Sequence, residues 1–171
     1  MIETKNLHLL PVERIYIEAS LRSKSELAAL LKVDVPAGWP HFPEAFSLPP
    51  DDLHMPSDWR GYFFIYPVEN ALIGNGGFHG PPDESGMVEI GYEIATEYWN
   101  RGFATEAAQA LIDYAFAHDE IQAVIAHTLG EKNASNSVLQ KVGMKFVAEL
   151  DDPEEGKVWR WMIARDEYQP T

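Results

Sequence analysis

The chain contains no cysteine among its 171 residues. Without a thiol it can form neither a disulfide bond nor a thiolate–metal site, and no cysteine nucleophile can carry a covalent intermediate. This absence fits the reducing cytoplasm, where structural disulfides are rare, so we expect a cytoplasmic protein.

Long hydrophobic runs are also missing. No apolar stretch approaches the roughly 18 residues that a membrane-spanning helix needs, and no apolar stretch follows a basic N-terminal segment. We therefore expect neither a signal peptide nor a membrane partner. The chain is nevertheless 46% hydrophobic and 12% aromatic, which is enough for a sizeable core. Its length favours one domain that spans residues 1–171.

Positive charge is scarce, since 13 Lys and Arg residues face 27 Asp and Glu residues and the net charge is −14. A nucleic-acid surface usually needs a basic patch, and none is visible, so we expect no nucleic-acid partner. The negative field would attract a cationic partner such as an amine. A second interpretation, that the charge only maintains solubility, stays open.

The chain is organised around a strand, a short loop and a helix. Residues 87–94 read as a strand, and apolar residues then recur at helical spacing from about Gly102 to His118. A helix start has main-chain N–H groups without internal partners and carries the positive end of the helix dipole. With Gly102 beside it, this helix start is a candidate phosphate site, and an ordinary turn is the alternative. Neither a dinucleotide-binding nor a Walker-type glycine motif occurs.

Two linked motifs resemble the coenzyme A site of the GCN5-related N-acetyltransferases (GNAT), in particular the RimJ/RimL type that acetylates ribosomal-protein N-termini. The first motif runs from Glu89 to Ala107, and the second comprises Asn133-Ala134-Ser135 and residues 138–146. Together with their surroundings they cover residues 71–161, which is over half of the chain.

The order of predicted elements indicates an α/β protein with a mixed sheet and helices on both faces. The resemblance implies a mostly antiparallel sheet in which two central strands, 87–94 and 122–128, run parallel and splay apart around the pantetheine arm. The other strands are predicted at 7–12, 61–66, 71–80, 145–150 and 158–163, and the other helices at 13–21, at 25–31 and from Asn133 or Ser135 to Gly143. Asp151–Gly156 is expected to be a solvated turn rather than a metal site.

Acetyl-CoA is the expected co-substrate, and no metal is expected. By resemblance, the main-chain N–H groups of a loop wrap the pyrophosphate; this loop comprises Trp99, Asn100, Arg101, Gly102, Phe103, Ala104 and Thr105. Tyr92, Glu93 and Ile94 bind the pantetheine through their main chain, like a short added strand. Asn133 matches an asparagine that binds the coenzyme arm, although an Asn before a helix can also be its N-cap.

Amine acetylation by a thioester needs a group that accepts the amine proton, and Glu89 is the leading candidate. On the strand it alternates with apolar Val88 and Ile90, so its side chain faces away from the core. Glu93 lies on the same face of the strand and is the second candidate. Aromatic surroundings are expected to raise the pKa of this carboxyl group. An exposed structural carboxylate is the alternative, and His79 and His127 are weaker candidates for the same role.

A group that protonates the leaving thiolate is harder to find. Many members of the resembled family place a Tyr on the helix after Asn133, but Leu139 occupies that position here, whereas Ser135 matches a Ser proposed for this role. Water is the remaining choice. The expected acceptor pocket is lined by Trp39, His79, Trp159 and Trp161. The Pro-rich and aromatic segment 34–58 either walls this pocket or covers the core.

The sequence therefore predicts an N-acetyltransferase that moves an acetyl group directly from acetyl-CoA to a primary amine, either a protein N-terminus or a small molecule. The alternative is a coenzyme-binding module without catalysis, used for sensing or assembly. A homodimer is left open.

Overall fold

The computed structural model of the chain describes residues 1–42 and 58–171, so most of the Pro-rich segment 34–58 lies outside the described residues. The described part forms one eight-stranded sheet in the order β1-β2-β3-β4-β5-β6-β8-β7. The strands are β1 (Ile2–Glu3), β2 (His8–Pro11), β3 (Gly61–Tyr66), β4 (Ala71–Phe78), β5 (Met87–Ile94), β6 (Ala123–Leu129), β7 (Lys145–Asp152) and β8 (Gly156–Ala164).

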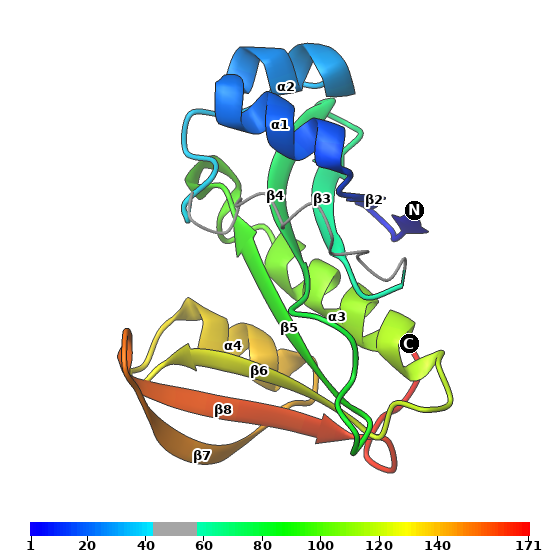
Figure 1. Cartoon of the computed structure of the whole chain (residues 1–171), viewed down its shortest axis with the longest axis vertical. Coiled ribbons are helices and arrows are strands. Elements are labelled where there is room, and N and C mark those ends of the chain that lie inside the picture. The colour runs from blue at the N-terminus through cyan, green and yellow to red at the C-terminus, as the bar shows by residue number, and fades with distance from the viewer. Residues whose placement is uncertain (43–57) are drawn as a thin grey trace.

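Neighbouring strands are antiparallel except at the centre, where β5 and β6 are parallel. These two strands pair only from Met87↔Ala123 to Glu89↔Ile125, at the beginning of each strand. Figure 1 shows β5 leaving β6 and running up to β3 and β4, while β6, β8 and β7 form the lower part of the sheet. The predicted splayed parallel pair is thus confirmed.

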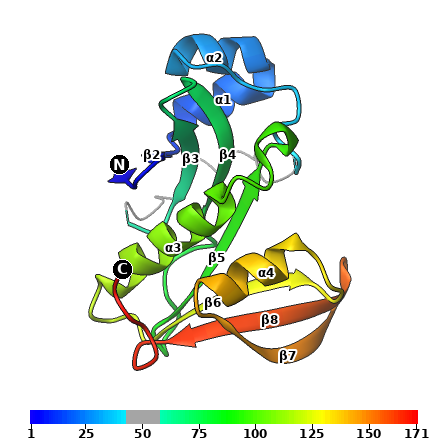
Figure 2. The same ribbon diagram turned by 180° about the vertical axis from the view of Figure 1, so that it is seen from behind.

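Helices cover both faces of the sheet, as predicted. They are α1 (Arg14–Arg22), α2 (Lys24–Leu31), α3 (Phe103–Phe116) and α4 (Ala134–Lys141), with a short 3₁₀ turn at Thr96–Tyr98 before α3. Figure 2 shows α3 and α4 on the near side of the strands, whereas α1 and α2 lie at the upper end beyond β3 and β4. In residues 1–42 and 58–171, none of the helices combines the length and the hydrophobicity of a transmembrane span.

The strand β3 is apolar on both faces because helices pack against each of them. On one face Phe63 contacts Tyr16 of α1 and the Trp39 ring, with ring centres 6.2 and 5.7 Å apart. On the other face Tyr62 contacts Tyr114 of α3 at 6.3 Å. Successive strand residues point to opposite faces, so the aromatic run fills both layers of the core.

The predicted start of α2 needs correction. The helix starts after Ser23 rather than at Ser25, because the extended Ser23 accepts a hydrogen bond from the Glu26 main-chain N–H at 3.1 Å. Its predicted end at Leu31 is confirmed, and the next residue, Lys32, is the C-cap in a left-handed conformation with φ 57°.

A carboxylate of α3 anchors the N-terminal segment, whose short strand β1 was not predicted. Glu106 accepts hydrogen bonds from the Thr4 hydroxyl at 2.6 Å and from the Asn6 side chain at 2.8 Å. Burial raises the pKa of Glu106, but these hydrogen bonds outweigh it and the net shift is downward.

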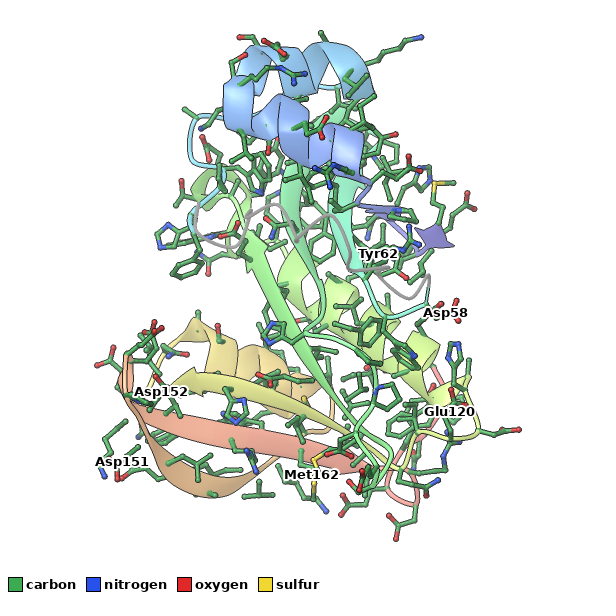
Figure 3. All side chains as sticks on the ribbon, in the orientation of Figure 1. Asp58, Tyr62, Glu120, Asp151, Asp152 and Met162 are labelled. Atoms are coloured by element: carbon green, nitrogen blue, oxygen red, sulfur yellow. The ribbon has the colours of Figure 1, made fainter. Side chains whose placement is uncertain are left out.

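The turn predicted at Asp151–Gly156 is present but shorter, because β7 extends to Asp152 and β8 begins at Gly156; Figure 3 shows Asp151 and Asp152 at the end of that hairpin. The Asp152 carboxylate accepts hydrogen bonds from the main-chain N–H groups of Glu154 and Glu155 at 2.8 and 2.9 Å. Asp151 is paired with Lys157 at 2.7 Å. These carboxylates therefore stabilise the turn itself.

Candidate functional site

The loop that enters α3, residues 99–105, presents free main-chain amides from Asn100 onward, whereas the Trp99 N–H donates to the Thr96 carbonyl oxygen at 3.3 Å. Among the described residues, no hydrogen bond uses the main-chain N–H groups of residues 100–105. Asn100 and Gly102 have φ values of 61° and 84°, on either side of Arg101. Alternation of left-handed and right-handed conformations turns successive N–H groups toward one point and forms an anion-binding concavity. The helix dipole of α3 adds to this potential.

Two side chains of the 99–105 loop have partners within the protein. Arg101 pairs with Glu69 at 3.1 Å and lies over the rings of Tyr66, Tyr98 and Phe103 at 5.0 to 5.2 Å. Its charge is thus partly balanced, and the amides supply most of the local attraction for an anion. The indole N–H of Trp99 donates to the Ile94 carbonyl oxygen at 2.7 Å, although half of the side chain is exposed.

Beyond Glu89, one edge of β5 has no neighbouring strand among the described residues, and we call it the unused edge. The residues from Ile90 to Ile94 pair with β4 on one side, but their pairing with β6 has already ended, and the Ile94 carbonyl oxygen accepts from the Trp99 indole instead. Tyr92, Glu93 and Ile94 therefore lie where an extended ligand can add itself to the sheet as a short strand. This edge leads directly to the 99–105 loop, so the loop and the edge form one continuous track.

Four side chains form a cluster on the face of the sheet opposite α3 and α4. Glu89 Oε1 lies 2.7 Å from His127 Nδ1 and 3.2 Å from His79 Nδ1. Arg160 Nε donates to His127 Nε2 at 3.0 Å. We call His79, Glu89, His127 and Arg160 the His–Glu cluster. It brings together the end of β4 and the strands β5, β6 and β8 at the point where β5 and β6 separate.

The environment of Glu89 corrects one expectation. Burial by itself raises the pKa of Glu89, but hydrogen bonds from His79 and His127 lower it, and the resulting pKa is about 2. The expected raised pKa is therefore wrong, because imidazoles and not aromatic hydrocarbons surround the carboxylate. Glu89 is ionised throughout the physiological range.

Glu93 lies on the same face, four residues along the strand, and is only 8% exposed. Its Oε2 accepts hydrogen bonds from the main-chain N–H groups of His41 and Phe42 at 3.1 and 2.9 Å. Nearby, the buried Trp39 donates to Asn75 of β4 at 2.6 Å. Glu93 thus anchors the segment after α2 over the upper end of β5, and Trp39 packs beneath it.

The other face of the splayed strands carries a second group of polar side chains. Tyr92 lies on the face opposite Glu89, and its hydroxyl group is near Ser135 in the first turn of α4. Burial raises the pKa of the Tyr92 hydroxyl, and Ser135 lowers it in part. Asn133 is the N-cap of α4 and accepts a hydrogen bond from the Asn136 N–H at 3.2 Å, which leaves the Asn133 amide N–H₂ available. Leu139 is 1% exposed and belongs to the core.

Two tryptophans expected in the acceptor pocket lie away from the His–Glu cluster. Trp159 and Trp161 of β8 pair with Thr128 and Ala126, whereas Arg160, between them, pairs with His127. Because strand side chains alternate, the two indoles point to the face of α4, opposite Glu89. Trp161 is 3% exposed and donates to the Thr128 hydroxyl at 3.0 Å. Of the four expected pocket residues, the structure brings His79 and Trp39 to the face of Glu89.

A hollow of about 760 Å³ lies along the outer side of α3, between β1 and the C-terminal residue. Gly102 and Thr105 line it together with Lys5 and Lys141, but no residue of the His–Glu cluster does. It is therefore continuous with the 99–105 loop and separate from the cluster. In residues 1–42 and 58–171, no group of three or more His, Asp or Glu side chains has the arrangement of a metal site.

Sequence reasoning missed Arg160 and Gly91. Arg160 lies between two tryptophans, and only the β6–β8 register shows that it is opposite His127. A Cβ at Gly91 would lie 2.6 Å from His79 Nε2, so the glycine makes room for this imidazole. The nearest sequence signal is the alternation of Glu89, Gly91 and Glu93 on one face of β5.

A sequence profile described as an acetyltransferase (GNAT) domain matches residues 37–145. The uncharacterized N-acetyltransferase YjdG of Bacillus subtilis is 27% identical over 148 residues, which are 84% of this chain and 88% of that protein. The fold is similar to that of RimL, a ribosomal L7/L12 α-N-protein acetyltransferase solved in complex with coenzyme A, with a TM-score of 0.71 at 16% identity over 96% of this chain and 97% of the other. A chimera of the spermidine N-acetyltransferase SpeG from Vibrio cholerae has a TM-score of 0.67 at 17% identity over 95% and 97% of the two chains.

Proposed function

Because the chain belongs to the acetyltransferase (GNAT) family and is an acetyl-CoA-dependent N-acetyltransferase, we propose that it transfers the acetyl group directly to a primary amine. The acceptor is either a protein N-terminus or a small amine, and residues 1–171 act as one catalytic domain. One observation carries the proposal. The free amides of residues 100–105, the unused edge of β5 and the His–Glu cluster follow one another along a single track.

In this proposal the coenzyme occupies that track from end to end. The pyrophosphate binds the free N–H groups of residues 100–105 in the 99–105 loop, and the pantetheine adds to the edge of β5 at Tyr92, Glu93 and Ile94. Asn133 contributes its free amide from the other side of the gap. The thioester then lies beside Gly91, where β5 leaves β6 and the missing Cβ of Gly91 makes room for the His79 imidazole.

The reaction uses the two faces of the splayed strands for different protons. The amine approaches from the face of Glu89, loses a proton there and attacks the thioester carbon. As the tetrahedral intermediate collapses, the C–S bond breaks and the thiolate is protonated from the face of α4, by Ser135 or by water. Glu93, held by two main-chain N–H groups, orders the segment that closes the upper end of the site.

The acceptor is proposed from two independent observations. The net charge of −14 draws cations toward the protein. Polyamines and protein N-termini are both cationic. Similar folds act on these two classes, because RimL is named as an α-N-protein acetyltransferase and SpeG as a spermidine N-acetyltransferase. We also place this chain in the RimL-like branch, which favours a protein N-terminus as the acceptor.

The test is a thiol-release assay with acetyl-CoA, in which spermidine, a peptide with a free N-terminus and the same peptide with a blocked N-terminus are compared. We expect coenzyme A release with at least one free amine and none with the blocked peptide. A protein that binds acetyl-CoA tightly but releases no thiol with any of them would contradict the proposal. That outcome would support the non-catalytic module, for which the buried Leu139 at the expected position of the acid is the one favourable observation.

A further inference from the structure

We propose that His79, held by Glu89 over Gly91, accepts the proton of the acceptor amine, and that Glu89 itself is a positioning residue. This inference rests on the proposed acetyl transfer to an amine and names the group that performs its proton step. Three observations of the His–Glu cluster support it, and they concern His127, Glu89 and His79 in turn.

The first observation is the protonation state of His127. The Arg160 guanidinium N–H can only donate, so His127 Nε2, 3.0 Å away, must accept and carries no proton. The Nδ1 of the same ring therefore holds the proton and donates it to Glu89 at 2.7 Å. Both nitrogens of His127 are thus occupied, and this imidazole is not available as a base.

The second observation concerns Glu89. A carboxylate with a pKa of about 2 is a weak base toward an alkylammonium ion, whose pKa is about 10. Its Oε1 is also shared between two imidazole N–H groups. Glu89 is therefore suited to hold and polarise its neighbours, as a buried carboxylate does for a catalytic histidine, and less suited to remove the proton itself.

The third observation is the position of His79 Nε2. The Nδ1 of this ring faces Glu89 at 3.2 Å, so the neutral ring carries its proton there and keeps a lone pair on Nε2. Among the described residues, no hydrogen bond uses this Nε2, and the side chain is 58% exposed. Nε2 lies 2.6 Å from the point where a Cβ of Gly91 would be, which is beside the proposed thioester. A base in this position reaches both solvent and the attacking amine.

Every proton released in this step has an acceptor. The ammonium form of the acceptor gives one proton to His79 Nε2, and the free amine then attacks the thioester carbon. A C–N bond forms, the C–S bond breaks, and the second proton lost by nitrogen passes through water to the thiolate. The imidazolium of His79, stabilised by the charge of Glu89, returns its proton to solvent before the next turnover.

The decisive measurement compares kcat for the His79→Ala and Glu89→Gln variants, with spermidine and with a peptide bearing a free N-terminus as acceptors. We expect His79→Ala to lower kcat by about 10²–10⁴-fold, the usual contribution of a general base, and Glu89→Gln to lower it less. His8→Ala, on the distant strand β2, is the matched control and should leave kcat unchanged. A larger loss in Glu89→Gln than in His79→Ala would overturn the inference.

The pH dependence separates a lost base from a damaged site. A peptide α-amine has a pKa of about 8, so at pH 9 most of it needs no base. The deficit of His79→Ala should therefore shrink several-fold between pH 7 and pH 9, whereas a purely structural defect would persist. The other charged or titratable members of the cluster, Glu89, His127 and Arg160, are unchanged in this variant.

Gly91→Ala provides an independent test without removal of any functional group. The three atoms nearest to the added Cβ all belong to the His79 imidazole, whose side chain is largely exposed, so the protein should fold while the imidazole is displaced. We expect kcat to fall, and the double variant with His79→Ala to be no slower than the slower single variant. Additive losses would contradict the inference.

A wild-type protein that acetylates no amine overturns the proposed function as well, whereas an active wild type whose His79→Ala variant keeps its rate overturns this inference alone.

Discussion

The 99–105 loop and the His–Glu cluster are built in different ways. The loop is one contiguous stretch, and its chemistry lies in main-chain N–H groups directed by the conformations of Asn100 and Gly102. The cluster collects side chains from the end of β4 and from β5, β6 and β8, and its chemistry depends on their protonation. The two regions meet on β5, which runs from the cluster to the loop.

This difference decides how each region responds to change. Main-chain amides do not titrate and survive most side-chain substitutions, so the loop should be sensitive only to backbone conformation. The cluster should be sensitive to pH and to the loss of any one imidazole or carboxylate. We therefore expect that some substitutions weaken coenzyme binding alone and that others slow proton transfer alone.

The largest expected effect concerns acid stability. The pKa of Glu89 falls from an ordinary value of 4.5 to about 2 on folding, so its contribution to stability is fully present above pH 4.5 and is lost as the pH falls toward 2. One pKa unit corresponds to about 1.4 kcal/mol, so the fall from 4.5 to about 2 gives a contribution of at most about 3.5 kcal/mol for this carboxylate. Urea unfolding between pH 6 and pH 2 should show this loss in the wild type.

Glu89→Gln is the comparison for that measurement, because Gln keeps a hydrogen-bond acceptor but cannot ionise. Its stability should decline less between pH 6 and pH 2 than that of the wild type, while the other carboxylates contribute equally to both. Parallel curves would show that Glu89 gains nothing from its imidazole neighbours. Acetyl-CoA binding at pH 7 should be similar in the two proteins, since the loop is not involved.

A smaller effect is expected when the backbone of the 99–105 loop is altered. Gly102 has φ 84° and no atom near its absent Cβ, so Gly102→Ala adds only left-handed backbone strain of about 1–2 kcal/mol. Relief of that strain would turn the amides of the loop away from the pyrophosphate. We expect acetyl-CoA to bind about ten-fold more weakly, with little change in kcat at saturation.

The chain offers a matched control in Gly156, at the start of β8 after the β7–β8 turn, with φ 78° and equally free space around it. Gly156→Ala should lose similar stability in a urea titration and bind acetyl-CoA like the wild type. Equal binding losses in both variants would mean that backbone strain anywhere weakens the site, and the contrast between the loop and the rest of the fold would fail.

The same contrast explains what the sequence could predict. The strand–loop–helix unit was readable because its signals are local, namely the helical spacing after Gly102 and the alternation before it. The strands and helices were found within a few residues, except for the two-residue β1, which carries no periodicity. The parallel pair and its splay came from the family resemblance, since no local pattern states which strands are neighbours.

The His–Glu cluster could be predicted only in part. Glu89, His79 and His127 were candidates individually, but their mutual contacts depend on the pairing of β4 with β5, of β5 with β6 and of β6 with β8. For the same reason the pKa of Glu89 was expected to rise, and Trp159 and Trp161 were expected near the acceptor. Register decides the face of a side chain, and it is a property of the whole sheet.

The smallest predicted effect concerns Asn133, which belongs to the coenzyme side but has a structural role as well. Its Oδ1 caps α4, whereas its amide N–H₂ is the group proposed to bind the coenzyme. Asn133→Ser keeps an N-cap oxygen and removes the amide, so the free energy of unfolding should change by less than about 0.5 kcal/mol. Loss of one hydrogen bond worth about 1 kcal/mol predicts roughly five-fold weaker binding of acetyl-CoA.

Ser23→Ala is the control, because Ser23 caps α2, another helix of the same length, at the upper end of the molecule and away from α4. It should lose about 1 kcal/mol of stability, as expected for a removed N-cap, and bind acetyl-CoA normally. Thermal unfolding and calorimetric titration with acetyl-CoA measure the two quantities. If Asn133→Ser bound acetyl-CoA as tightly as the wild type, Asn133 would be a cap alone, and the coenzyme side would rest on main-chain groups without help from this amide.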